Sequence, residues 1–204
     1  MPLILLTRHG HVDGIKPERF RGRAELALTA LGQNQARLLA HRIVSDWSPT
    51  VVYCSPLQRC VATGTAVASA CGIELQPLGE LNDLDYGEWQ SRTYEEARTD
   101  APELLATWFA APQLVRFPDG EALQDVAART AGVLRYVLSR HQADTVVLVG
   151  HDSVNRVLLT QLLDMPLSSY WRFAQHPCCI NVIEMTGNSV QLQRLNDTGH
   201  LGSP

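Results

Sequence analysis

The sequence predicts an α/β fold with three layers, in which helices cover both faces of a mostly parallel central sheet. Short runs of continuously apolar or β-branched residues alternate with longer amphipathic stretches along the 204 residues, a pattern typical of parallel α/β proteins. These apolar runs do not alternate with polar residues, as expected of strands that are covered on both faces. The length suits a single domain over residues 1–204.

Short sequence signals predict the elements of the first half. The apolar run Leu3 to Leu6 and the β-branched run TVVYCS at residues 50–55 predict buried strands. Thr29 can cap a helix that runs to about Ser45. The apolar face of this helix consists of Leu31, Leu38, Leu39 and Ile43. The Ser-Pro pair after TVVYC opens the next helix, and GIEL at residues 72–75 predicts a short strand.

The middle of the chain predicts a polar loop and helices. Residues 82–93 form a loop rich in polar and aromatic groups, and residues 94–109 form two short helices because Pro102 interrupts them. A long helix is expected from Gly120 to about His141. Its buried stripe consists of Leu123, Val126, Leu134, Val137 and Leu138.

The last third predicts a second buried strand and a hairpin. TVVLVGHD at residues 145–152 is an apolar run that ends in a histidine, and a helix follows from Ser153. INVIEM and SVQLQRL flank Gly187-Asn188, so these two runs predict an antiparallel hairpin.

Composition excludes several classes of function. The net charge of −4 provides no basic surface for nucleic acid, and no apolar run approaches the length of a membrane helix. No signal peptide is expected, because no basic region precedes a long apolar stretch at the N-terminus. The chain has five cysteines without a CxxC spacing, which favours reduced thiols and a cytoplasmic location: Cys54, Cys60, Cys71, Cys178 and Cys179.

Two strands deliver histidines to the same edge of the predicted sheet. His9 follows the first strand and His151 follows the strand at 145–150. Ligands of α/β sheets bind at the carboxyl ends of the strands. Arg8 ends the first strand, and Arg59 stands near a helix N-terminus, where the helix dipole favours anions. These two arginines and two histidines predict a phosphate pocket.

The chain resembles the histidine phosphatase superfamily, which is also called phosphoglycerate mutase-like. The resemblance covers nearly the whole chain and rests on these motifs: Arg8-His9-Gly10; Leu28-Thr29…Gly32…Gln35-Ala36; Ser55-Pro56-Leu57-Gln58-Arg59; Leu81-Asn82-Asp83…Tyr86-Gly87; Gly120-Glu121; Val149-Gly150-His151. It implies a phosphoglycerate mutase-like fold and a phosphatase acting on a small phosphorylated metabolite.

The resemblance also implies a role for each site residue. His9 would attack phosphorus and form a phosphohistidine, with a backbone carbonyl fixing the tautomer of its ring. Arg8, Arg59 and His151 would hold the phosphoryl oxygens, where charge gathers in the transition state. Asp83 would protonate the leaving alcohol. This chemistry needs no metal and no cofactor.

The chain departs from the family at several positions. His11, Val12 and Ile15 stand where relatives commonly have Glu, Thr or Ser, and Asn. Asp83 replaces the usual Glu, and Asp152 directly follows the second histidine, as the acid does in another branch of the superfamily. Either aspartate is therefore a candidate for the proton donor, and Asp152 is also a candidate helix cap.

Three alternative functions remain open at this stage. HGHVDG resembles the start of a metallohydrolase ligand motif, although Gly14 stands where that motif needs a further histidine. A phosphoglycerate mutase would need extra cations for a second anionic group. A non-catalytic protein that binds phospho-ligands is the third alternative, and a homodimer is compatible with all of them.

For several other charged residues the sequence leaves two interpretations open. Arg21, Arg23 and His176 either lie at the mouth of the pocket or are solvated at the surface. Glu121 either caps the long helix or takes part in the chemistry.

Overall fold

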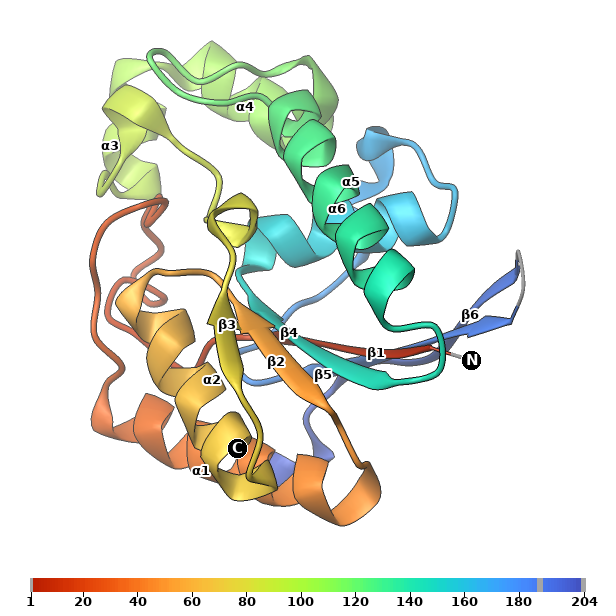
Figure 1. Ribbon diagram of the computed structural model, residues 1–204. Helices are drawn as coiled ribbons and strands as arrows, with labels where there is room; N and C mark the ends of the chain where they lie inside the picture. The colour runs from red at the N-terminus through yellow and green to blue at the C-terminus, as the bar shows by residue number, and fades with distance from the viewer. Residues whose placement is uncertain (1, 187–188, 203–204) are drawn as a thin grey trace.

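The central feature of the computed structural model is one sheet, shown in Figure 1. The structure describes residues 2–186 and 189–202. Within these residues six strands form the sheet: β1 (Leu3–Arg8), β2 (Val51–Cys54), β3 (Leu75–Pro77), β4 (Thr145–Gly150), β5 (Ile180–Thr186) and β6 (Ser189–Asp197). Their order across the sheet is β3-β2-β4-β1-β5-β6.

The sheet is mostly parallel, as the sequence predicts. β2 pairs in parallel with β3 and β4, β4 pairs in parallel with β1, and β5 is antiparallel to both β1 and β6. In this register Arg8 lies beside Gly150, and Cys54 lies beside Val149. The ends of β1, β2 and β4 therefore meet at one edge of the sheet.

Helices cover both faces of the sheet (Figure 1). One face carries α1 (Ala30–Asp46) and α2 (Gln58–Cys71), and the other carries α5 (Leu123–Arg140) and α6 (Asp152–Leu162). The short helices α3 (Tyr94–Asp100) and α4 (Pro102–Ala110) lie on the side of α5 and α6. None of the helices within the described part of the chain is long and apolar enough to cross a membrane.

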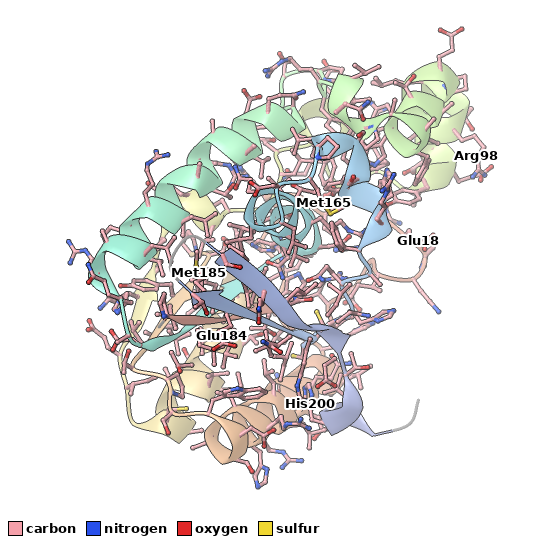
Figure 2. All side chains as sticks on the ribbon, turned by 90° about the vertical axis from the view of Figure 1, so that its right-hand side faces the viewer. Glu18, Arg98, Met165, Glu184, Met185 and His200 are labelled. Carbon is pink, nitrogen blue, oxygen red and sulfur yellow. The ribbon has the colours of Figure 1, made fainter. Side chains whose placement is uncertain are left out.

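Successive residues of each central strand pack into different cores. Ile4 and Val146 belong to the core under α5 and α6, whereas Leu5 and Val147 belong to the core under α1 and α2. Figure 2 shows the layers from a second direction, with Met165 above the sheet and His200 below it. The central strands are largely apolar because both of their faces are buried.

Most of the predicted elements are confirmed. Pro102 separates α3 from α4 and begins the second helix, where its missing N–H costs no hydrogen bond. Thr29 caps α1, since its hydroxyl accepts from the Gly32 N–H at 3.1 Å. β5 and β6 form the predicted antiparallel pair, and the predicted turn at Gly187-Asn188 lies outside the described residues.

Two details of the prediction are wrong. Leu31 is 53% exposed, because the buried face of α1 is built instead from Gly32, Ala36, Leu39, Ala40 and Ile43. The short strand predicted for GIEL at residues 72–75 lies instead at Leu75–Pro77. Gly72 has a φ of 67° and donates to the carbonyls of Ala68 and Ser69, so it ends α2 and delays the strand until Leu75.

Candidate active site

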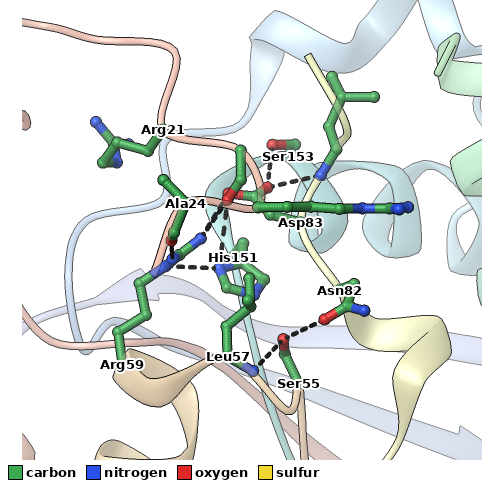
Figure 3. Close-up of polar contacts among 12 residues, drawn as sticks. Arg21, Ala24, Ser55, Leu57, Arg59, Asn82, Asp83, His151 and Ser153 are labelled. Atoms are coloured by element: carbon green, nitrogen blue, oxygen red, sulfur yellow. Dashed lines mark hydrogen bonds and ion pairs between the residues drawn. The ribbon is translucent and has the colours of Figure 1, made fainter. Parts of the chain in front are cut away.

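Five polar side chains from distant segments gather at the carboxyl edge of the sheet, and Figure 3 shows Arg59, Asp83 and His151 among them. Arg8 and His9 leave β1, His151 leaves β4, Arg59 lies in the first turn of α2, and Asp83 lies in the loop after β3. All five are buried, with residue exposures between 0 and 6%. The structure brings the two arginines and two histidines together, and Asp83 lies with them.

His9 is held as a neutral imidazole with one free nitrogen. Its Nδ1 lies 2.7 Å from the carbonyl oxygen of Gly10. A carbonyl can only accept, so Nδ1 carries the proton and Nε2 keeps its lone pair. Burial lowers the pKa of His9 well below its usual 6.5, and the charges of Arg59 and Arg8 lower it further. The arrangement produces a nucleophilic nitrogen at neutral pH.

The glycine after His9 is required by a close crossing of two segments. A Cβ on Gly10 would collide with the carbonyl of Gly32 in the first turn of α1, and a Cβ on Gly32 would collide with the carbonyl of His11. The Gly10 N–H donates to the Thr63 hydroxyl of α2 at 3.1 Å. This crossing fixes the backbone on which His9 stands.

Arg8 is a buried cation with few protein partners. Its Nη1 donates to the carbonyl of Gln175 at 2.6 Å, while its buried Nε has no partner. No carboxylate among the described residues lies within 4.0 Å of the Arg8 guanidinium nitrogens. Burial lowers the pKa of Arg8, and the charge of Asp152 opposes that shift. A buried guanidinium without a counter-ion is costly, and an anion in the site would offset the cost.

Arg59 differs from Arg8 because the protein already occupies its donors. Its Nη1 donates to the Ala24 carbonyl at 2.7 Å, and its Nη2 donates to the Gly22 carbonyl at 2.6 Å. Nη2 also reaches the Asp83 carboxylate at 3.2 Å, and Nε reaches Nδ1 of His151 at 3.2 Å. A guanidinium has five N–H groups, so one remains for a ligand.

Arg59 also sets the tautomer of His151. Because Nδ1 of His151 accepts from Arg59, the proton of the neutral ring lies on Nε2. Burial lowers the pKa of His151 well below 6.5, with Arg59 and Arg8 contributing in the same direction. The rings of His151 and His9 meet edge to face, with their centroids 5.2 Å apart.

The two candidate acids lie in different surroundings. Asp83 accepts from the Ser153 hydroxyl at 2.7 Å, in addition to its contact with Arg59, and lies 3.6 Å from Nδ1 of His151. Asp152 is the first residue of α6 and forms an ion pair with Arg156 at 2.9 Å. An acidic residue in the first turn of a helix is favoured by the helix dipole. Asp83 is thus part of the cluster, whereas Asp152 has a structural partner of its own.

The structure places Arg21, Arg23 and His176 in different surroundings. Arg21 is half-buried, donates to the Gly14 carbonyl at 2.7 Å, and is close enough to lower the pKa of Arg8. Arg23 is exposed and pairs with Asp85 and Glu121 at 3.2 Å each. His176 is exposed and lies 2.7 Å from the Asn196 side chain.

Glu121 does not cap the long helix. That helix begins at Leu123, and the carboxylate of Asp125 accepts from the Ala122 N–H at 2.8 Å. Glu121 accepts instead from the Asp85 N–H at 3.0 Å and pairs with Arg129.

The His-x-His-x-Asp triplet does not assemble a metal centre. Nδ1 of His11 lies 3.0 Å from the Thr29 hydroxyl, and Asp13 is exposed. Across residues 2–186 and 189–202, no group of three or more His, Cys, Asp and Glu side chains is arranged to hold a metal ion.

The sequence did not reveal several groups that hold the site together. Ser153 contacts Asp83, and the backbone carbonyls of Gly22, Ala24 and Gln175 accept from the two arginines. Backbone acceptors leave no signature in the sequence. A serine two residues after a strand-end histidine was the one available signal.

Comparisons with known proteins agree with this geometry. The sequence model of the histidine phosphatase superfamily, branch 1, matches residues 4–198. Phosphoserine phosphatase 1 of Hydrogenobacter thermophilus is 32% identical over 202 residues, which cover 99% of this chain and 95% of that protein. Adenosylcobalamin/alpha-ribazole phosphatase of Escherichia coli is 27% identical over 191 residues and is matched over 94% of both chains. The solved structure of Bacillus stearothermophilus YhfR has a TM-score of 0.92 at 25% identity and covers 98% of this chain and 100% of that chain.

Proposed function

Because the chain belongs to the histidine phosphatase superfamily, we propose that it hydrolyses a small phosphomonoester through a phosphohistidine on His9. One observation carries the proposal. The free Nε2 of neutral His9 shares a buried site with Arg8, a guanidinium that has no carboxylate partner among the described residues. A nucleophile beside an unpaired cation is the arrangement that phosphoryl transfer needs.

The first step forms the covalent intermediate. The phosphoryl group binds to Arg8 and to the remaining N–H of Arg59, and the Nε2–H of His151 donates to a phosphoryl oxygen. Nε2 of His9 attacks phosphorus as the bond from phosphorus to the ester oxygen breaks. Asp83 gives its proton to the departing alkoxide.

The second step releases phosphate. Asp83, now a carboxylate, takes a proton from a water molecule as the water oxygen attacks phosphorus. The bond between phosphorus and Nε2 of His9 breaks, and inorganic phosphate leaves. Asp83 has regained the proton that it gave to the alcohol, so the enzyme returns to its starting state.

The arginines of residues 88–118 favour hydrolysis over mutase activity. A mutase needs free cations for a second anionic group of its substrate, and residues 88–118 contain three arginines. Each of these is already paired with a carboxylate: Arg92 with Asp100, Arg98 with Glu95, and Arg116 with Asp125.

The relatives suggest the class of substrate. Two of them are named for phosphoserine and for alpha-ribazole phosphate, which are small phosphomonoesters. A cytoplasmic location belongs to the same proposal and fits the five cysteines, none of which forms a disulfide within the described residues. A homodimer remains a prediction that light scattering can check.

A panel of phosphomonoesters tests the proposed function. We expect kcat/KM to favour one small metabolite over the generic substrate 4-nitrophenyl phosphate. We expect His9→Ala to abolish turnover and EDTA to leave it unchanged. Near-normal turnover by His9→Ala would refute the proposal. Efficient conversion of 3-phosphoglycerate to 2-phosphoglycerate would favour the mutase alternative.

A further inference from the structure

Arg129 of α5 donates hydrogen bonds to the backbone of the loop that carries Asp83. Its Nη1 donates to the Glu80 carbonyl at 2.6 Å, and its Nη2 donates to the Asp83 carbonyl at 3.1 Å. The same guanidinium makes two parallel bonds of 3.0 Å to the carboxylate of Glu121. Both side chains are 16% exposed, so the ion pair is largely shielded from water. Bidentate pairs of this kind are strong and fix geometry.

Glu121 forms hydrogen bonds with the backbone of Asp85, two residues further along the same loop. Its Oε2 accepts from the Asp85 N–H at 3.0 Å, and its own N–H donates to the Asp85 carbonyl at 2.9 Å. The backbone approaches so closely that a Cβ on Gly120 would collide with this carbonyl. Arg129 and Glu121 together are called the loop clamp below. The clamp fixes backbone groups of residues 80, 83 and 85.

The clamp determines where the Asp83 carboxylate lies. The Asp83 carbonyl is held by Arg129, while its carboxylate contacts Arg59 and Ser153 (Figure 3). With the backbone held at this residue, few rotamers of a short side chain reach both partners. We propose that Arg129 and Glu121 are positioning residues for the proton donor Asp83. This inference rests on the proposed function, in which Asp83 is the acid.

The role differs from that of a catalytic residue. Arg129 donates two N–H groups to the Glu121 carboxylate and two to backbone carbonyls. None of these acceptors takes part in the reaction. The hydrogen bonds of Arg129 therefore act on the reaction through the position of Asp83, while its charge also lowers the pKa of His151. A general acid that is displaced by about 1 Å can cost on the order of 10²-fold in rate.

The test compares leaving groups in three variants. Arg129→Met removes the clamp, Arg129→Lys keeps the ion pair but cannot hold both carbonyls, and Arg135→Met is the control. Arg135 lies on the same helix, is exposed, and has the same charge. Each variant is assayed on the best alkyl phosphate of the panel and on 4-nitrophenyl phosphate, whose anion leaves without a proton. Thermal melting reports the loss of stability separately.

We expect Arg129→Met to lower kcat on the alkyl phosphate at least ~10-fold more than on 4-nitrophenyl phosphate, with little change in KM. Arg129→Lys should fall between this variant and the wild type, and Arg135→Met should match the wild type. Glu121→Gln should shift the same ratio in the same direction as Arg129→Met.

Several results would overturn the inference. Equal losses on both substrates would show that the clamp only stabilises the fold, and an unchanged ratio would show that it does not position the acid. If Asp83→Asn itself lacks this leaving-group pattern, the inference fails together with the assignment of the acid. Phosphohistidine formation on His9 is measured separately, so its presence would show that the proposed function survives either failure.

Discussion

Replacement of Arg59 by lysine keeps the positive charge and removes the shape of the group. The guanidinium spans four acceptors in three segments, at distances of 2.6 to 3.2 Å. These are the carbonyls of Gly22 and Ala24, the Asp83 carboxylate and Nδ1 of His151. The ammonium of a lysine is a point charge on a flexible stem, so it cannot span these acceptors.

The size of the loss caused by Arg59→Lys follows from the number of hydrogen bonds that the lysine cannot make. If the ammonium retains two of the four contacts, two bonds from a charged donor are lost, and each contributes about 1.5–3 kcal/mol. The total of roughly 3–6 kcal/mol divides between folding and the transition state. We expect kcat/KM to fall by about 10²–10³, which corresponds to roughly 3–4 kcal/mol, and Tm to fall as well. Part of the loss comes from His151, whose tautomer is no longer fixed.

The assay is steady-state kinetics together with thermal melting of Arg59→Lys. Arg37→Lys is the control, because Arg37 is exposed on α1 and its guanidinium hydrogen-bonds only to Asn34 among the described residues. We expect the control to behave like the wild type. An Arg59→Lys enzyme with wild-type kcat/KM would show that the four contacts do not matter for the reaction. A variant with lower Tm and unchanged kinetics would confine Arg59 to folding.

Three further predictions follow from the geometry of the site. Asp83→Asn should reduce the hydrolysis of alkyl phosphates far more than that of 4-nitrophenyl phosphate, and Asp152→Asn should not; the reverse pattern would make Asp152 the acid. The folded-state pKa values of His9 and His151 lie below the unfolded value near 6.5, so the unfolded state binds more protons in acid. The free energy of unfolding that the two neutral histidines contribute should therefore be fully present above about pH 6.5. It should decline as pH falls, with a slope that approaches about 1.4 kcal/mol per pH unit for each histidine. Urea titrations in phosphate-free buffer that give the same free energy of unfolding at pH 7 and pH 5.5 would contradict this. Inorganic phosphate at about 100 times its Kd should raise Tm by roughly 5–10 °C, and Arg8→Met should lose most of that shift; an undiminished shift would place the anion elsewhere.

The parts of the site that lie on regular elements could be predicted from the sequence. Parallel strands end at a common edge, so residues that follow β1 and β4 had to meet, and the register of Arg8 beside Gly150 bears this out. Arg59 could be placed because a Ser-Pro pair marks the start of α2, a helix that begins beside the same edge.

The parts that lie on irregular segments could not be predicted. The carbonyls of Gly22 and Ala24 belong to a loop without periodicity, and any residue supplies a carbonyl. The position of Glu121 near the predicted start of a helix suggested a capping role. In the structure its carboxylate instead contacts Asp85, which is distant in sequence, and Arg129. The choice between Asp83 and Asp152 was open in the sequence because each aspartate matches the place of the acid in one branch of the superfamily. The contact of Asp83 with Arg59 and its distance of 3.6 Å from His151 favour Asp83 on geometric grounds.

Direct trapping of the phosphoryl-enzyme tests the central claim. The enzyme is mixed with its best substrate and quenched in alkali within milliseconds, because a phosphohistidine survives base and is lost in acid. Intact mass and peptide sequencing then locate the phosphoryl group. We predict a single phosphoryl group on His9 in the wild type, a larger trapped fraction in Asp83→Asn with 4-nitrophenyl phosphate, and none in His9→Ala. A phosphoryl group on another residue, or full turnover without any trapped intermediate in Asp83→Asn, would contradict the account.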